Sequence, residues 1–102
     1  DGHVSDVCSL DPLDEKFHAF GWHVICCNGH DVTAIRAALA EAVACDTAPV
    51  AVIFKTIKGK GVSFMEDNAG WHGNAPSAEQ AAQALAEIDA VGAQLAATVK
   101  EA

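Results

Sequence analysis

The stretch VAVIFKT at residues 50–56 is the feature that most constrains the fold of this chain. It is a nearly unbroken apolar run that is rich in β-branched residues. Such a run is typical of a parallel strand covered on both faces, because a strand with one wet face alternates polar and apolar residues. The segment 22–27, WHVICC, reads as a second short buried strand, and Asn28-Gly29 ends it.

The segments around these two strands have helical patterns. In residues 11–20, Asp11 is placed to cap a helix, Pro12 suits its first position, and Gly21 ends it. Its apolar face consists of Leu13, Phe17 and Phe20. A second helix is predicted over residues 31–45, capped by Asp31. The apolar stripe of this second helix consists of Val32, Ile35, Leu39 and Val43.

A third helix is predicted near the C-terminal end of the sequence. Ser77 and Gln80 have the spacing of a capping box. The apolar positions that follow are Leu85, Ile88, Val91, Leu95 and Val99. The order helix, strand, helix, strand, loop, helix predicts an α/β fold with a parallel sheet and a right-handed crossover over residues 31–45.

Two buried strands make a poor sheet by themselves. We therefore expect a partial, Rossmann-like parallel sheet with covering helices, whose other strands lie elsewhere. The two strands either pair directly or are separated by a third strand from outside the sequence. Residues 1–102 would then be a single-domain fragment, or a subunit that is completed by another chain.

Composition narrows the classes of function. The net charge of −8 and the pI of about 4.8 argue against nonspecific nucleic-acid binding. No apolar run reaches the roughly 18 residues that a membrane span needs, and no signal peptide opens the sequence. Of the four cysteines, Cys8, Cys26, Cys27 and Cys45, the adjacent Cys26 and Cys27 are expected to be buried reduced thiols of a cytoplasmic protein, pointing to opposite faces of a strand. Zinc is disfavoured, because the spacing of His23, Cys26, Cys27 and His30 fits no common structural site.

The connection KGKGVSFMEDNAGWHGNAP at residues 58–76 is long and lacks periodicity, which favours a functional loop. Lys55, Lys58 and Lys60 are half of the six Lys and Arg residues, so an anionic ligand is indicated here. Glycines let backbone N–H groups approach a phosphate, and a lysine adds a point charge. The alternatives are an ordinary turn, lysines that keep a strand end hydrated, and His72 as a solvated loop residue.

In order and spacing, the segments FGWHVI, NGHD and KTIKGKGVSFMEDNAGWHGNAP together resemble the thiamine-diphosphate-binding domain of transketolases. The resemblance extends from DGHVSD to Ser77. It is strongest to the N-terminal subunit of transketolases that are split into two chains. It implies a transferase of the pentose phosphate pathway, which moves a two-carbon ketol unit between sugar phosphates with thiamine diphosphate and magnesium.

The resemblance also implies roles for residues of the loop. Lys58 would bind the cofactor, and Gly59 and Gly61 would let the loop approach it. His72 would lie beside the diphosphate and the substrate, as a cofactor-binding and catalytic residue. The NGHD turn would be structural, since Asp31 begins a helix there.

The sequence departs from the family pattern in its metal motif. A GDG followed by an Asn is absent, so no metal ligand is expected in this chain. The partners implied are the remainder of the diphosphate-binding domain and a pyrimidine-binding subunit with its activating glutamate, in a cytoplasmic oligomer. The chain alone would be inactive. The alternatives are a deoxyxylulose phosphate synthase, a dehydrogenase E1 component, or a non-catalytic assembly module.

Overall fold

The computed structural model describes residues 2–100, and the side chains of residues 2–98. Residues 2–56 form one compact unit, and the residues from Ile57 onward form another. The first unit contains α1 (Val4–Cys8), α2 (Leu13–Ala19), β1 (His23–Asn28), α3 (Val32–Ala44) and β2 (Val50–Lys55). The second unit contains the 3-10 helix η1 (Ala69–Trp71) and α4 (Ala78–Lys100).

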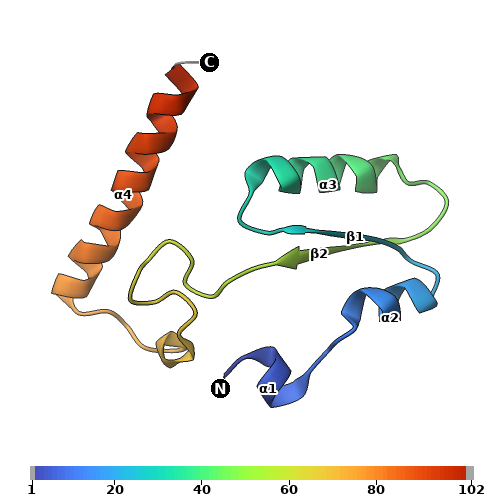
Figure 1. The fold of residues 1–102 in the computed structure, drawn as a ribbon, viewed down its shortest axis with the longest axis horizontal. Coiled ribbons are helices and arrows are strands. Elements are labelled where there is room, and N and C mark those ends of the chain that lie inside the picture. Colours follow the sequence, from blue (N-terminus) through green and yellow to red (C-terminus); the bar gives the residue numbers. More distant parts are fainter. Residues whose placement is uncertain (1, 101–102) are drawn as a thin grey trace. The chain divides into compact units, whose positions relative to one another are not determined.

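The two strands of the first unit pair directly and in parallel. The register runs from His23 opposite Val50 to Asn28 opposite Lys55. Helix α3 connects the strands and packs on both of them, while α2 packs on β1 from the other face of the sheet (Figure 1). The predicted α/β fold, parallel pairing and crossover helix are therefore confirmed, and within the described residues no third strand separates the two.

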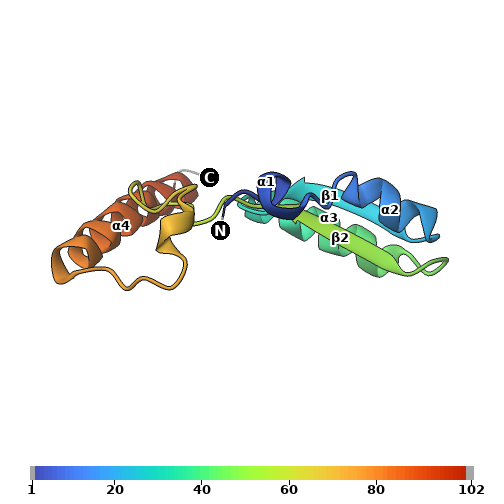
Figure 2. The same cartoon turned by 90° about the horizontal axis from the view of Figure 1, so that it is seen from below.

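The core of this unit is small. Its buried side chains are Ile25 on β1, Ala51 on β2 and Ala38 on α3. Seen from below, the two strands lie side by side, with α2 near β1 (Figure 2). Two strands and two helices bury little apolar surface, which agrees with a sheet that is only part of a larger fold.

Helix α3 begins as predicted but packs differently. The Asp31 carboxylate caps it by accepting hydrogen bonds from Thr33 N (2.8 Å) and Ala34 N (3.2 Å). The predicted apolar stripe is mostly wrong as a packing face, since Val32 is 70% and Val43 is 88% exposed, although Ile35 is partly buried. Ala38 is buried instead. In a helix rich in alanine, periodicity allows more than one apolar face, and the face with small side chains approaches the sheet.

Helix α2 is also corrected in detail. Asp11 does not cap it, because the N-cap is Pro12 and no side-chain capping bond forms. Phe20 follows the last helical residue and is 83% exposed, so it does not share the packed face. Phe17 does pack, edge-on against Trp22, with ring centroids 5.5 Å apart. Helix α1 had no counterpart among the predicted elements.

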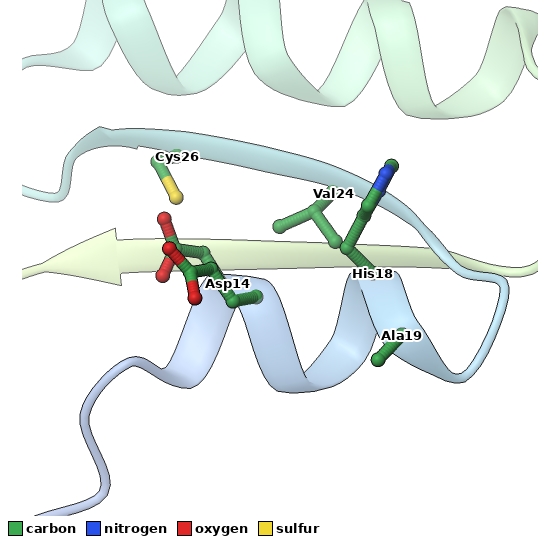
Figure 3. A pocket seen from close by; sticks show the side chains of 6 residues that line it. Asp14, His18, Ala19, Val24 and Cys26 are labelled. Carbon is green, nitrogen blue, oxygen red and sulfur yellow. The ribbon is translucent and has the colours of Figure 1, made fainter.

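All four cysteines are free, but the expected burial of Cys26 and Cys27 is wrong. Cys8 and Cys26 are exposed, and Cys27 and Cys45 are partly buried. Cys26 lines an open groove of about 400 Å³ between β1 and α2, and Figure 3 shows Val24 and Cys26 projecting towards that helix. A short helix leaves this part of the sheet uncovered, which is why the expected burial fails here.

The remaining expectations concern metal ligands and membrane-spanning helices. Among the described residues, no three His, Cys, Asp or Glu side chains are grouped to hold a metal ion. His23 pairs instead with Glu41, at 2.8 Å between Nε2 and Oε1. No helix within residues 2–100 combines the length and the apolarity that crossing a bilayer needs.

Helix α4 in the second unit begins with the predicted capping box. Ser77 N donates to Gln80 Oε1 (2.8 Å), and Gln80 N donates to Ser77 Oγ (3.3 Å). Four of its predicted apolar positions are exposed in this chain, namely Leu85, Ile88, Val91 and Leu95. The side chain of the fifth, Val99, lies outside the described residues, as does Asp1.

Candidate functional site

The loop at residues 57–73 is a series of turns that closes on itself. Val62 N donates to Gly59 O (3.2 Å), and Asp67 N donates to Lys58 O (2.8 Å). Val62 O accepts from both Met65 N and Glu66 N, each at 2.9 Å. Val62 is also the buried side chain of the loop, at 8% exposure. Backbone bonds thus give the loop a defined shape without help from regular secondary structure.

The two glycines beside Lys60 serve this shape in different ways. Gly59 has φ +67°, and a Cβ there would lie 2.5 Å from Met65 O, so the loop's two arms meet at this point. Gly61 has φ +96°, and nothing lies within 4 Å of the place of its Cβ. Gly59 is therefore required by the close approach within the loop, whereas Gly61 is required only by its positive φ and has open space beside its Cα.

This difference predicts unequal effects of two matched substitutions. Gly59→Ala should displace the 65–67 arm and destabilise the loop, because both backbone strain and a clash with backbone oppose it. Gly61→Ala meets backbone strain alone, of about 1 kcal/mol. Amide exchange across residues 58–67 measures the effect, and we expect the larger loss of protection in Gly59→Ala. Equal protection in the two variants would contradict the role given to the Gly59–Met65 approach.

Of the two loop lysines, Lys60 is engaged and Lys58 is not. Lys60 Nζ lies 2.7 Å from Glu66 Oε1, and Gly61 N donates to Glu66 Oε2 at 3.3 Å. The exposed Lys58 ammonium makes no hydrogen bond or ion pair with any described residue. Lys58 is therefore the loop cation that is available to an external anion.

The contacts of Glu66 test whether this loop suits a diphosphate. Its carboxylate is an oxyanion that accepts from a lysine ammonium and from a backbone N–H of the glycine turn. Phosphate oxygens use the same two kinds of donor. Glu66 already occupies both of these donors, so the fit to an anionic cofactor group rests on Lys58, whose ammonium has no partner among the described residues.

His72 follows η1, and its position is set by its neighbours. Its backbone N donates to Ala69 O at 3.0 Å. Trp71 Nε1 donates to Phe64 O (2.8 Å), and the two rings pack with centroids 5.3 Å apart. Trp71 therefore packs within the loop. The His72 imidazole is exposed and has no partner among the described residues, so both ring nitrogens are available for a ligand or a proton.

The four predicted site residues, Lys58, Gly59, Gly61 and His72, thus lie in one unit and on one loop. Among the described contacts, no hydrogen bond or ion pair joins Lys58 to His72. The NGHD turn belongs to the other unit and is locally bonded: Asn28 Oδ1 accepts from His30 N (2.9 Å) and Gly29 N donates to Lys55 O (2.9 Å).

Two carboxylates of the site were not among the predicted residues. Glu66 lies within the loop, and a Lys–Glu pair six residues apart is its only sequence signal. Glu87 lies on α4 and accepts from Ser63 N (2.6 Å) and Ser63 Oγ (2.7 Å). The Ser63 backbone, Gln83 and the Ser63 hydroxyl, in that order, lower the pKa of Glu87 below its ordinary value. No local pattern could have linked residues 24 positions apart.

Comparison with known proteins shows which family this chain resembles. A family model described as "Transketolase, thiamine diphosphate binding domain" matches residues 1–94. The 6-deoxy-6-sulfo-D-fructose transketolase subunit SqwG of Clostridium sp. (strain MSTE9) is 37% identical over 93 residues, which cover 91% of this chain and 34% of that protein.

Two further relatives have the same level of identity. An apulose-4-phosphate transketolase subunit of Actinobacillus succinogenes is 37% identical over 87 residues, which cover 85% of this chain and 31% of the relative. Human transketolase is 37% identical over 79 residues, 78% of this chain and 12% of the human protein. The chain thus spans about a third of the two bacterial proteins and much less of the human enzyme.

Proposed function

The chain belongs to the transketolase family, matching its thiamine-diphosphate-binding domain, and on that premise we propose that it works in an enzyme that transfers a two-carbon ketol unit between sugar phosphates. The observation that carries this proposal is the loop with a free Lys58 ammonium and an unpartnered His72 imidazole among the described residues. The lysine is available to a phosphate, and the histidine is available to a proton or a substrate oxygen.

In this proposal, bound thiamine diphosphate would act as the electron sink for the C–C bond cleavage that such a transfer needs. Lys58 binds a diphosphate oxygen, and the open side of Gly61 lets the backbone approach. His72 donates a hydrogen bond to the diphosphate or to a substrate oxygen near the reacting carbon. Magnesium would neutralise the diphosphate, and its protein ligands would come from polypeptide other than these residues.

We also propose that residues 1–102 are the C-terminal part of a diphosphate-binding domain. Two relatives are named as transketolase subunits, and this chain covers about a third of each. The partners would be the remainder of that domain and a pyrimidine-binding subunit, in a cytoplasmic oligomer of the pentose phosphate pathway. The few buried side chains of the first unit support a need for further polypeptide.

The test compares the chain alone with the complete assembly. Thiamine diphosphate and magnesium are titrated calorimetrically, and turnover is followed with xylulose 5-phosphate and ribose 5-phosphate. We expect the 102-residue chain alone to be inactive and the assembly to bind cofactor and turn over. Activity of the isolated chain would contradict the need for partners. A complete assembly without cofactor affinity would overturn the enzymatic role and favour an assembly module.

A further inference from the structure

The carboxylate of Glu87 on α4 binds the loop at residues 57–73 through two hydrogen bonds. Ser63 N donates to Glu87 Oε2 at 2.6 Å, and Ser63 Oγ donates to Glu87 Oε1 at 2.7 Å. Gln83 Nε2, one turn earlier on the helix, donates to Oε1 at 2.8 Å. Figures 1 and 2 both show the loop lying beside α4. Three donors thus converge on one acceptor, and two of them belong to the same loop residue.

The anchored residue lies at the centre of the loop's own bonding. Ser63 follows Val62, which is the buried residue of the loop. The Val62 carbonyl accepts two backbone hydrogen bonds, and the Val62 N–H donates to Gly59 O. Gly59 follows Lys58, whose carbonyl accepts from Asp67 N. A constraint on Ser63 is therefore passed through short bonded steps to Lys58.

We propose that Glu87 is a positioning residue for the loop at residues 57–73, because its carboxylate ties Ser63 to α4 and thereby holds Lys58 in its binding geometry. This rests on the proposed function of the loop. Hydrogen bonds to a charged acceptor are stronger than neutral ones, and two at one residue restrict both its position and its orientation. A preorganised loop binds its ligand without the cost of ordering it.

Two variants of Glu87 separate this role from helix stability. Glu87→Ala removes all three bonds and keeps the helix, since alanine is the best helix former. Glu87→Gln keeps the shape but removes the charge. The matched control is Glu79→Gln, on the same helix, where the carboxylate accepts from Ser77 Oγ (2.8 Å) and makes no hydrogen bond with the described residues of the loop.

The first readout needs no cofactor. Amide exchange of Ser63 in the full chain should accelerate about tenfold or more in Glu87→Ala, the scale of losing a bond to a charged acceptor, and should be unchanged in Glu79→Gln.

The second readout is thiamine diphosphate binding by the complete assembly with magnesium. We expect the dissociation constant to rise about three- to tenfold in both Glu87 variants, with turnover at saturating cofactor within about twofold of the original.

The outcomes are distinguishable. If Ser63 exchange accelerates but cofactor affinity equals that of Glu79→Gln, the positioning role is wrong and the proposed function stands. If turnover at saturating cofactor falls as much as affinity does, Glu87 supports the structure in general and the positioning role is again wrong. If the unsubstituted assembly fails to bind thiamine diphosphate, the proposed function fails and takes this inference with it.

Discussion

His72→Ala is expected to lower turnover of the assembled enzyme about 100-fold or more at saturating thiamine diphosphate, the scale of losing a positioned proton-transfer or oxyanion partner. The imidazole is exposed and unpartnered among the described residues, so no internal bond is lost with it. The folded stability should therefore change little. Steady-state kinetics with varied donor sugar, together with a thermal melt, measure both quantities.

A substitution at Trp71, which precedes His72, should have an intermediate effect on turnover. Trp71 is bonded to Phe64 O and packs on its ring, so Trp71→Ala should misplace the histidine and reproduce part of its loss. His18→Ala, at an exposed histidine on α2, is the control and should leave turnover unchanged. Near-normal turnover and donor affinity in His72→Ala would reduce the histidine to a solvated loop residue.

Lys58→Ala is expected to act on cofactor binding more than on turnover. A lysine on a phosphate contributes a charge-assisted bond, so its loss should raise the thiamine diphosphate dissociation constant about tenfold or more. Turnover at saturating cofactor should be largely kept. Titration calorimetry of the assembly with cofactor and magnesium provides the measurement.

Lys60 is the matched control for this prediction. It has the same charge two positions away, but its ammonium is already paired with Glu66 at 2.7 Å. Lys60→Ala should therefore weaken cofactor binding less than Lys58→Ala does. A larger effect at Lys60 would mean that the cofactor displaces Glu66, and that Lys58 is not the loop's principal anion-binding cation.

Much of the fold could be predicted because its signals are local. The nearly unbroken apolar run at 50–56 predicts a strand, and the position of Asp31 predicts a helix cap. Both signals lie in neighbouring residues, and both predictions are confirmed. The packing face of α3 could not be predicted in this way. Its large apolar side chains and its alanines have similar periodicity, and only the tertiary contact decides that Ala38 faces inward.

Burial was over-predicted for a related reason. Cys26 lies in a strand with the composition of a buried strand, yet within the described part of this chain only the short α2 lies over its face, and the thiol is exposed. The amino-acid composition of a strand indicates whether the strand is suited to a buried position. The observed exposure of its side chains depends on the elements that cover it. The two disagree here because few elements cover the strand.

The residues of the candidate site also differ in whether the local sequence reveals them. Lys58, Gly59, Gly61 and His72 could be named because they share one short motif, although their roles in binding and catalysis stay predictions. Glu87 could not be named, because its link to Ser63 depends on how α4 packs against the loop. Lys60 was one of three lysines taken to indicate an anionic ligand, and only the structure shows that Glu66 pairs with its ammonium.

The register of the sheet has a consequence for the order in which the chain folds. Every strand pair, from His23 with Val50 to Asn28 with Lys55, joins residues 27 positions apart. Closing a flexible loop of that length costs about 3 kcal/mol of chain entropy before the first sheet bond forms. Helix α3, whose bonds join residues only four apart, occupies 13 of those positions. When it forms first, it replaces a flexible stretch with a rod of about 20 Å, so the two strands meet across a shorter and stiffer connection.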